Sequence, residues 1–395
     1  MAISDLDTGL AKEAQAMMKE VRQFVRDLVR PAGVELDGKA DPAEVTAGGS
    51  PFWDVFRAFR KLDLHCLGIP EYAGGIGGID PLVPVLIAEL LGYGDAGLAV
   101  SLAESDVPFR FAALSESPKL KKLAGDYCAD RDCKMLGCRA MWPGSDSTER
   151  PGSPGLTISR KGKQYVVNGE APRVANGCVA THCLAELRSG GEGEDLCLAV
   201  IPLDLPGVSR GAHAPRWGQR SLNQAALFFK DVKIPQDFVL PGDSAALENL
   251  MRGFSARSLG LTAAVFTGLS ACAFDEALKY SRDRIQGGVP IFRHRNIKRK
   301  LFEMWKNVEA ARSVSRRLAG PLAGSSAAAF WPQAAAMKCL ATETAADVAS
   351  DAIQVLGGYG LAREYPIEKL FRDARAGMAE NGANEALALQ AAASF

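Results

Sequence analysis

The first third of the chain carries the hydrophobic periodicity of α-helices. Between positions 14 and 29, apolar side chains recur every three or four residues, which predicts an amphipathic helix that ends at Pro31. The same period returns over residues 52–64 and 82–91. We therefore expect residues 1–134 to form an N-terminal α-helical domain.

The pattern changes in the middle of the chain. Short apolar runs at 164–167, 196–201 and 226–229 are bounded by Gly, Pro, Asn and Asp, which is typical of strands and turns. No helical pattern of about ten residues separates these runs, so we predict an antiparallel sheet, built as a small barrel or sandwich, over residues 135–243.

The helical period returns toward the C-terminus. Long stretches rich in small and apolar residues span 247–283, 301–318 and 334–356. Small side chains let helices pack closely, so residues 244–395 are predicted to form a four-helix bundle. The predicted fold class is α+β and mostly α, with an N-terminal helical domain, a middle antiparallel β domain and a C-terminal bundle.

Composition and charge argue against several classes of function. Lys plus Arg and Asp plus Glu both number 46, so the net charge is zero, which argues against a nucleic-acid partner. No signal-peptide pattern is visible, and no apolar run reaches the roughly 18 residues of a membrane span. Nine cysteines, an odd number without a signal, suit reduced thiols in the cytoplasm. The four histidines are scattered and the cysteines lack zinc-site spacing, so we predict no metal site.

Several segments point to a known family. Residues 351–360 read Asp-Ala-Ile-Gln-Val-Leu-Gly-Gly-Tyr-Gly, and residues 372–375 read Arg-Asp-Ala-Arg. Residues 217–221 read Trp-Gly-Gln-Arg-Ser, residues 284–291 read Arg-Ile-Gln-Gly-Gly-Val-Pro-Ile, and residues 143–146 read Pro-Gly-Ser-Asp. Together these segments resemble motifs of the acyl-CoA dehydrogenase family, and the resemblance covers nearly the whole chain.

The resemblance implies a flavoprotein that binds FAD between its domains, accepts an acyl-CoA thioester and assembles as a homo- or hetero-tetramer. An electron-transfer flavoprotein or another acceptor is expected to reoxidise it. In this chemistry a base removes the α-proton of the acyl group while the β-hydrogen leaves as hydride. The thioester carbonyl must be hydrogen-bonded, because negative charge develops on its oxygen.

The family's flavin contacts carry over to this sequence position by position. The residues that the resemblance places at the flavin are Gly144, Ser145, Arg173, Val174, Ala175, Arg284, Gln286, Arg295, Gln354, Gly357, Gly358, Ala383 and Glu385. Arg284 matches the arginine that pairs with the pyrophosphate, where a cationic fork suits phosphate oxygens. Gln354, Gly357 and Gly358 match residues that approach the dinucleotide of a neighbouring subunit.

Other positions depart from the family pattern. Residues 173–175 read Arg-Val-Ala where the family has Trp-Ile-Thr or Trp-Ile-Ser against the flavin ring, so the indole and the hydroxyl are both lost. Ala383 replaces a threonine, and Arg295 stands where glutamine is usual. Ser145 and Arg257 are assigned, by resemblance, to the pantetheine side of the thioester.

The catalytic base is the largest departure. The family glutamate, whose backbone N–H also binds the thioester carbonyl, falls at Asn381, and the position that some members use instead falls at Ala256. Glu380 precedes Asn381 by one residue, and a shift of one residue in an irregular loop could direct its carboxylate toward the substrate. We therefore predict Glu380 as the base and Asn381 as the backbone donor, with a solvated surface glutamate as the alternative for Glu380.

Three functions stay open from the sequence. The first is FAD-dependent α,β-dehydrogenation of an acyl-CoA with an atypical base. The second is other thioester chemistry in the same fold, such as reduction, elimination or N-hydroxylation. The third is a non-catalytic subunit of a heteromeric acyl-CoA dehydrogenase, because departures gather at the flavin and base positions together.

Overall fold

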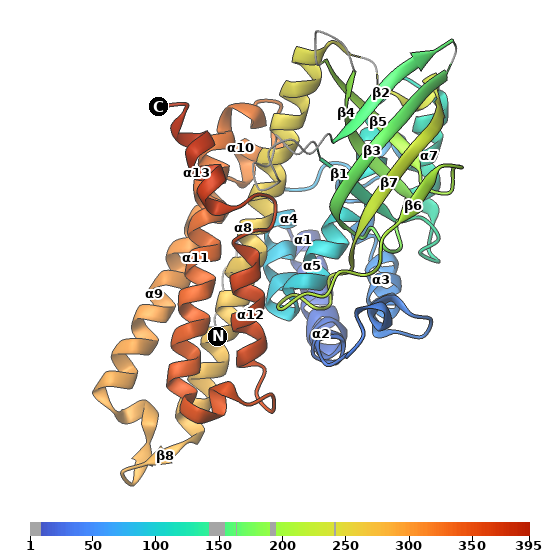
Figure 1. The fold of residues 1–395 in the computed structure, drawn as a ribbon. Coiled ribbons are helices and arrows are strands. Elements are labelled where there is room, and N and C mark those ends of the chain that lie inside the picture. Colours follow the sequence, from blue (N-terminus) through green and yellow to red (C-terminus); the bar gives the residue numbers. More distant parts are fainter. Residues whose placement is uncertain (1–8, 142–154, 163, 190–194, 241) are drawn as a thin grey trace.

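The computed structural model describes residues 9–141, 155–162, 164–189, 195–240 and 242–395 (Figure 1). The N-terminal region is helical, as predicted. Its α-helices are α1 (Lys12–Phe24), α2 (Arg30–Asp37), α3 (Pro51–Lys61), α4 (Leu82–Gly94), α5 (Ala96–Glu104), α6 (Val107–Leu114) and α7 (Pro118–Ala129). The apolar side chains of the periodic segments lie in one large core, which also includes residues of the C-terminal helices.

The prediction that Pro31 ends the first helix is wrong. A π-helical turn, Val25–Val29, follows α1 directly, and α2 continues the helical path to Asp37. Pro31 stands in the first turn of α2, where a residue without an N–H loses little hydrogen bonding. The proline is therefore accommodated where the hydrogen-bond pattern changes.

The middle region forms one seven-stranded sheet. Its strands are β1 (Gly137–Ala140), β2 (Leu156–Lys161), β3 (Gln164–Ala175), β4 (His182–Ser189), β5 (Leu196–Pro202), β6 (Val208–Arg210) and β7 (Gln224–Pro235). The sheet order is β1-β4-β2-β3-β7-β6, and β5 pairs with β4. The β2–β3, β3–β7, β4–β5 and β6–β7 pairs are antiparallel, as predicted.

Two pairings correct the prediction of a wholly antiparallel sheet. β4 lies between β1 and β2 and is parallel to both. A parallel pair needs a long crossover connection, which is usually a helix. Here the β2–β3 hairpin supplies the connection between β1 and β4, so no helical pattern appears in the sequence. The sheet is consequently mixed.

The C-terminal region consists of helices of different length. They are α8 (Ser244–Asp283), α9 (Arg295–Arg317), α10 (Ala319–Ala323), α11 (Trp331–Leu356), α12 (Ile367–Gly377) and α13 (Asn384–Ala392), with a short hairpin of β8 (Ile285–Gln286) and β9 (Val289–Pro290) after α8. Figure 1 shows the bundle extending away from the sheet, with β8 at its far end. α8 packs against α11, α9 and α4.

α8 is long and apolar enough to cross a membrane by length and composition, but 83% of its apolar window is buried inside the protein. It is therefore a core helix of the protein. The chain changes from helix to strand between Ala129 and Gly137, and from strand to helix between Pro235 and Ser244. The proposed domain limits at 134 and 243 fall in these intervals.

Candidate active site

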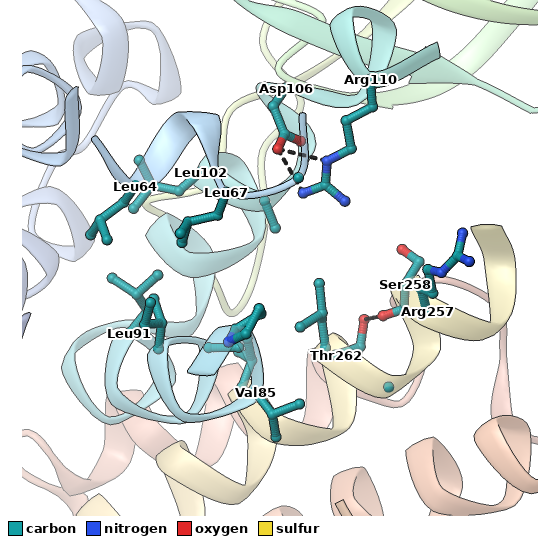
Figure 2. A pocket seen from close by; sticks show the side chains of 18 of the residues that line it. Leu64, Leu67, Val85, Leu91, Leu102, Asp106, Arg110, Arg257, Ser258 and Thr262 are labelled. Carbon is teal, nitrogen blue, oxygen red and sulfur yellow. Dashed lines mark hydrogen bonds and ion pairs between the residues drawn. The ribbon is translucent and has the colours of Figure 1, made fainter. Parts of the chain in front are cut away.

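A cavity of about 470 Å³ lies between α4, α5 and α6 on one side and α8 on the other. We call it the central cavity (Figure 2). Most of its wall is aliphatic, and the side chains of Leu64, Leu67, Val85, Leu91 and Leu102 are among those that line it. Such a wall binds an apolar group by removing its surface from water.

One side of the central cavity is polar. Asp106, which directly precedes α6, forms an ion pair of 2.6 Å with Arg110 on that helix, and Arg257 lies across from them on α8 (Figure 2). Arg257 donates hydrogen bonds to the carbonyl oxygens of Leu322 and Gly324. Burial lowers the pKa of Arg257, and the charge of Arg110 lowers it further. The guanidinium groups of Arg110 and Arg257 suit a polar part of a ligand, and the carboxylates of Asp106 and Glu104, which also line the cavity, balance their charge.

A second cavity, of about 460 Å³, lies against the sheet, and we call it the sheet-side cavity. The predicted flavin-ring residues Arg173, Val174 and Ala175 all line it. Two ion pairs also lie on its wall. They are Arg216–Glu380, at 2.5 Å, and Arg139–Glu104, at 3.0 Å.

The two cavities meet at Asn381. Val100, Glu104 and Asn381 line both of them. The side-chain amide of Asn381 donates to Thr262 Oγ1 at 2.6 Å, and its Oδ1 accepts from Arg139 Nη2 at 2.6 Å. The backbone of Asn381 is left-handed, with φ of 51°, a region that asparagine tolerates better than most residues.

Glu380 does not lie on the central cavity. Its carboxylate is held by Arg216 and lines the sheet-side cavity, so the one-residue shift does not turn it toward the apolar wall. The side chain is only 13% exposed, which also differs from a solvated surface glutamate. Its role as a base stays a prediction, and it lies on the cavity that the predicted flavin-ring residues line rather than on the apolar one.

A third cavity, of about 770 Å³, lies near β8 at the far end of the bundle, and we call it the bundle-end cavity. It brings together residues that the sequence placed at the flavin, namely Arg284, Gln286, Gln354, Gly357 and Gly358. The Arg284 guanidinium lies 5.7 Å from the centre of the Tyr359 ring. His294 Nε2 lies 3.1 Å from the carbonyl oxygen of Gln286 and fixes the β8 turn against the start of α9.

The remaining predicted residues fall elsewhere. Arg295 is the first residue of α9, and Ala383 and Glu385 lie at the start of α13, and none of the three lines any of these cavities. Gly144 and Ser145 lie outside the described residues. Arg257 lines the central cavity, where the resemblance assigned the pantetheine.

Sequence reasoning missed four side chains of the site. They are Glu104, Arg139 and Thr262, which build the junction, and Arg216, which holds Glu380 on the wall of the sheet-side cavity. A signal was present for Glu104, which is the only charged residue in the apolar stretch 96–104. Buried acids are rare unless they are paired, so an acid in such a stretch marks a site or an ion pair.

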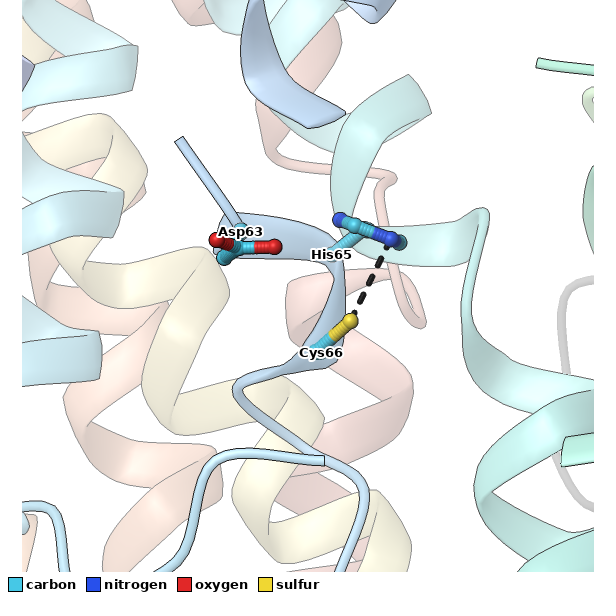
Figure 3. Close-up of side chains that lie close together, drawn as sticks. All are labelled: Asp63, His65 and Cys66. Atoms are coloured by element: carbon cyan, nitrogen blue, oxygen red, sulfur yellow. Dashed lines mark hydrogen bonds between the residues drawn. The ribbon is translucent and has the colours of Figure 1, made fainter. Parts of the chain in front are cut away.

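Outside the cavities, Asp63, His65 and Cys66 lie close enough to share a metal ion (Figure 3). Asp63, however, is ion-paired with Arg131. A hydrogen bond with Cys128 and burial raise the pKa of the Cys66 thiol, which disfavours the thiolate that a metal needs. These pairings give the three side chains a structural role, and we assign no metal to them.

Comparison with known proteins identifies the family. Residues 11–109 match the family model described as acyl-CoA dehydrogenase, N-terminal domain, and residues 251–395 match the model of its C-terminal domain. Cyclohexane-1-carbonyl-CoA dehydrogenase of Geobacter metallireducens is 26% identical over an alignment of 384 positions that covers 95% of each chain. Cyclohex-1-ene-1-carbonyl-CoA dehydrogenase of the same organism is 28% identical over 95% of this chain and 96% of its own length.

Solved structures share the fold. Butyryl-CoA dehydrogenase of Megasphaera elsdenii superposes with a TM-score of 0.84 at 22% identity, over 98% of this chain and 99% of that chain. A Bacillus anthracis acyl-CoA dehydrogenase complexed with FAD gives 0.83 at 22% identity, over 98% of this chain and 67% of that one. The expected fold class and cofactor are confirmed: this chain belongs to the acyl-CoA dehydrogenase family, whose members are FAD flavoproteins.

Proposed function

We propose that the chain catalyses FAD-dependent α,β-dehydrogenation of an acyl-CoA thioester. The observation that carries this proposal is the junction of the central and sheet-side cavities at Asn381. Within the described parts of the chain, the backbone N–H of Asn381 has no hydrogen-bond acceptor. It is therefore available to a thioester carbonyl, where it would stabilise the charge that develops as the α-proton leaves.

The proposed substrate carries a bulky, apolar acyl group. Cavities of about 300–1,000 Å³ hold drug-sized ligands, and the central cavity, at about 470 Å³, falls within that range. A short acyl chain would leave much of the aliphatic wall without contacts. Two curated relatives are named for ring-containing thioesters, cyclohexane- and cyclohexene-carbonyl-CoA. The cavity volume favours a large acyl group, and the names of these relatives favour a carbocyclic one.

The residues of this chain suit an FAD site to which two chains each contribute one part. The bundle-end cavity offers the guanidinium of Arg284, the amides of Gln286 and Gln354, and glycine backbone, a donor set that suits phosphate oxygens. The sheet-side cavity offers room for a ring beside residues 173–175. When bound, FAD supplies the acceptor for the β-hydrogen, which leaves the substrate as hydride.

The separation of the two parts favours an oligomer. The bundle-end cavity lies near β8, at the opposite end of the molecule from the sheet (Figure 1). One chain cannot bring both parts to one FAD, so the bundle-end cavity would serve a neighbour. We propose a homo- or hetero-tetramer in the cytoplasm, reoxidised by an electron-transfer flavoprotein or another acceptor.

Product analysis tests the proposed reaction. The FAD-loaded protein is incubated with butyryl-, decanoyl- and cyclohexanecarbonyl-CoA and an artificial electron acceptor, and the thioesters are analysed by mass spectrometry. We expect the cyclic thioester to lose two hydrogens faster than butyryl-CoA does, because it fills more of the central cavity. Failure of all three thioesters to lose hydrogen, although the protein holds FAD, would contradict dehydrogenation.

A second candidate is a non-catalytic subunit of a heteromeric dehydrogenase. The departures from the family pattern at residues 173–175 and at Asn381 lie in the sheet-side cavity, whereas the bundle-end cavity keeps Arg284, Gln354 and both glycines. A chain with this asymmetry could complete the flavin site of a catalytic paralogue without using its own. In that case the isolated chain would hold no FAD, and the complex formed on co-expression with the paralogue would hold one FAD for every two chains.

A further inference from the structure

We propose that Glu104 accepts the α-proton of the substrate. This inference rests on the proposed dehydrogenation and names the base that the family's glutamate position, now Asn381, no longer supplies. Glu104 is the last residue of α5 and is only 6% exposed. Among the described residues it is the one carboxylate that lines both the central and the sheet-side cavities.

The position of Glu104 matches the requirement of the reaction. The α-carbon has to lie between the acyl-binding wall and the flavin, because its proton and the neighbouring hydride leave in the same conversion. A base must come within hydrogen-bond reach of the proton that it takes. The junction of the two cavities is where both conditions meet, and Glu104 and Asn381 are there together.

Arg139 ties the carboxylate to the family's base position. Its Nη2 donates to Glu104 Oε1 at 3.0 Å and to Asn381 Oδ1 at 2.6 Å. Arg139 therefore bridges Glu104 and Asn381, the residue that stands at the family's glutamate position. Arg139 is itself packed 5.3 Å from the centre of the Phe254 ring, so the carboxylate is held by an ordered partner.

The other acids near the cavities are worse placed. Glu380 is paired with an arginine, as Glu104 is, but it lines only the sheet-side cavity. Asp106 lines only the central cavity, where Arg110 pairs with it at 2.6 Å. Each of these two carboxylates therefore lines only one of the two cavities, whereas Glu104 lines both.

The proposed step moves one proton to Glu104 and one hydride to FAD. The α-carbon–hydrogen bond breaks, and the proton passes to a carboxylate oxygen of Glu104. The electron pair of that bond becomes the second bond between the α- and β-carbons as the β-hydrogen leaves with its own pair to FAD. The N–H of Asn381 holds the thioester oxygen meanwhile.

Exchange of α-hydrogen with solvent tests the base without turnover. Phenylacetyl-CoA has α-hydrogens, but its β-carbon is an aromatic carbon without hydrogen, so dehydrogenation cannot follow. The protein is incubated with this thioester in deuterium oxide, and deuterium at the α-carbon is measured by mass spectrometry. We expect exchange by the wild type and a loss of at least ~100-fold in Glu104→Gln, as is typical when a general base is removed.

Controls separate the role of Glu104 from a loss of structure. Glu276→Gln removes a carboxylate that is also paired with an arginine, Arg30, but that lines none of the three cavities. It should exchange at the wild-type rate. Glu104→Asp keeps the charge but shortens the side chain by one methylene, so its exchange rate should fall at least tenfold. Thermal unfolding and thioester affinity are measured for every variant.

The outcomes discriminate between the two proposals. Exchange by Glu104→Gln within tenfold of the wild type overturns the inference and leaves the dehydrogenation proposal standing. If Glu104→Gln does not fold, wild-type exchange by Glu104→Asp overturns it equally. A wild type that binds phenylacetyl-CoA but never exchanges its α-hydrogen overturns the proposed function, and the inference with it.

Discussion

Replacing Lys369 by methionine should lower the free energy of unfolding by about 3–5 kcal/mol, the cost of leaving buried charges without their partner. Lys369 Nζ lies 2.6 Å from Asp95 Oδ2 and 2.5 Å from Asp373 Oδ2, and all three side chains are buried. Burial disfavours the charge on Lys369, but the carboxylates of Asp373 and Asp95 outweigh it and keep the pKa of Lys369 above its ordinary value.

This cluster joins the three regions of the chain. Asp95 caps α5 in the N-terminal region and accepts a hydrogen bond from Ser221 in the middle region at 2.5 Å. Asp373, on α12, accepts the backbone N–H of Gln219. Removing the one cation would leave two carboxylates facing each other, so the regions should loosen together.

The measurement is urea unfolding followed by circular dichroism. Lys122→Met is the matched control, because Lys122 also lies 2.6 Å from a carboxylate, that of Asp126, but on the surface. The control should cost less than about 1 kcal/mol. Adding Asp373→Asn to Lys369→Met should recover part of the loss. Equal stability of Lys369→Met and Lys122→Met would show that the cluster does not hold the regions together.

Replacing Arg284 by alanine should weaken FAD binding about ten- to hundredfold. A charge-assisted hydrogen bond to a phosphate is worth roughly 1.5–3 kcal/mol, and each 1.4 kcal/mol is about tenfold in affinity. Arg284 is the arginine at the bundle-end cavity that the family resemblance assigns to the pyrophosphate, and Tyr359 lies beside its guanidinium.

FAD retention on dilution, read from flavin fluorescence, measures this effect. Arg293→Ala removes an exposed arginine in the short turn before α9 that does not line the cavity, and it should leave FAD retention as it is in the wild type. If Arg284→Ala keeps full FAD occupancy at dilutions where the wild type begins to lose it, the bundle-end cavity is not the phosphate site.

The sequence was informative wherever one local pattern decides the structure. Periodicity identified the long helices, and the short bounded runs identified strands β3, β5 and β7. It was misleading where a local signal is overridden by its neighbourhood. Pro31 reads as a helix end, but a π-helical turn before it places it in a first turn. The parallel pairs of β4 were hidden, because strands rather than a helix connect β1 and β2 to β4.

The same limit applies to the site. Family motifs located the bundle-end residues, because Arg284 and the segment 354–358 are short contiguous signals that fold together. The junction is built from α5, β1, α8 and the segment before α13, which are far apart in the chain. Arg139 and Asn381, for example, are separated by 242 positions. A pairing of this kind leaves no local pattern, and the acid nearest in sequence to Asn381, Glu380, consequently looked like the base.

The visible absorption spectrum of the FAD-loaded protein tests the central claim most directly. The spectrum is recorded without oxygen before and after addition of cyclohexanecarbonyl-CoA, with no other electron acceptor present. Dehydrogenation reduces the flavin, so we predict that its visible absorption bands fall after the thioester is added. Bands that stay unchanged with this thioester, and with butyryl- and decanoyl-CoA, would contradict the assignment of acyl-CoA dehydrogenation to this chain.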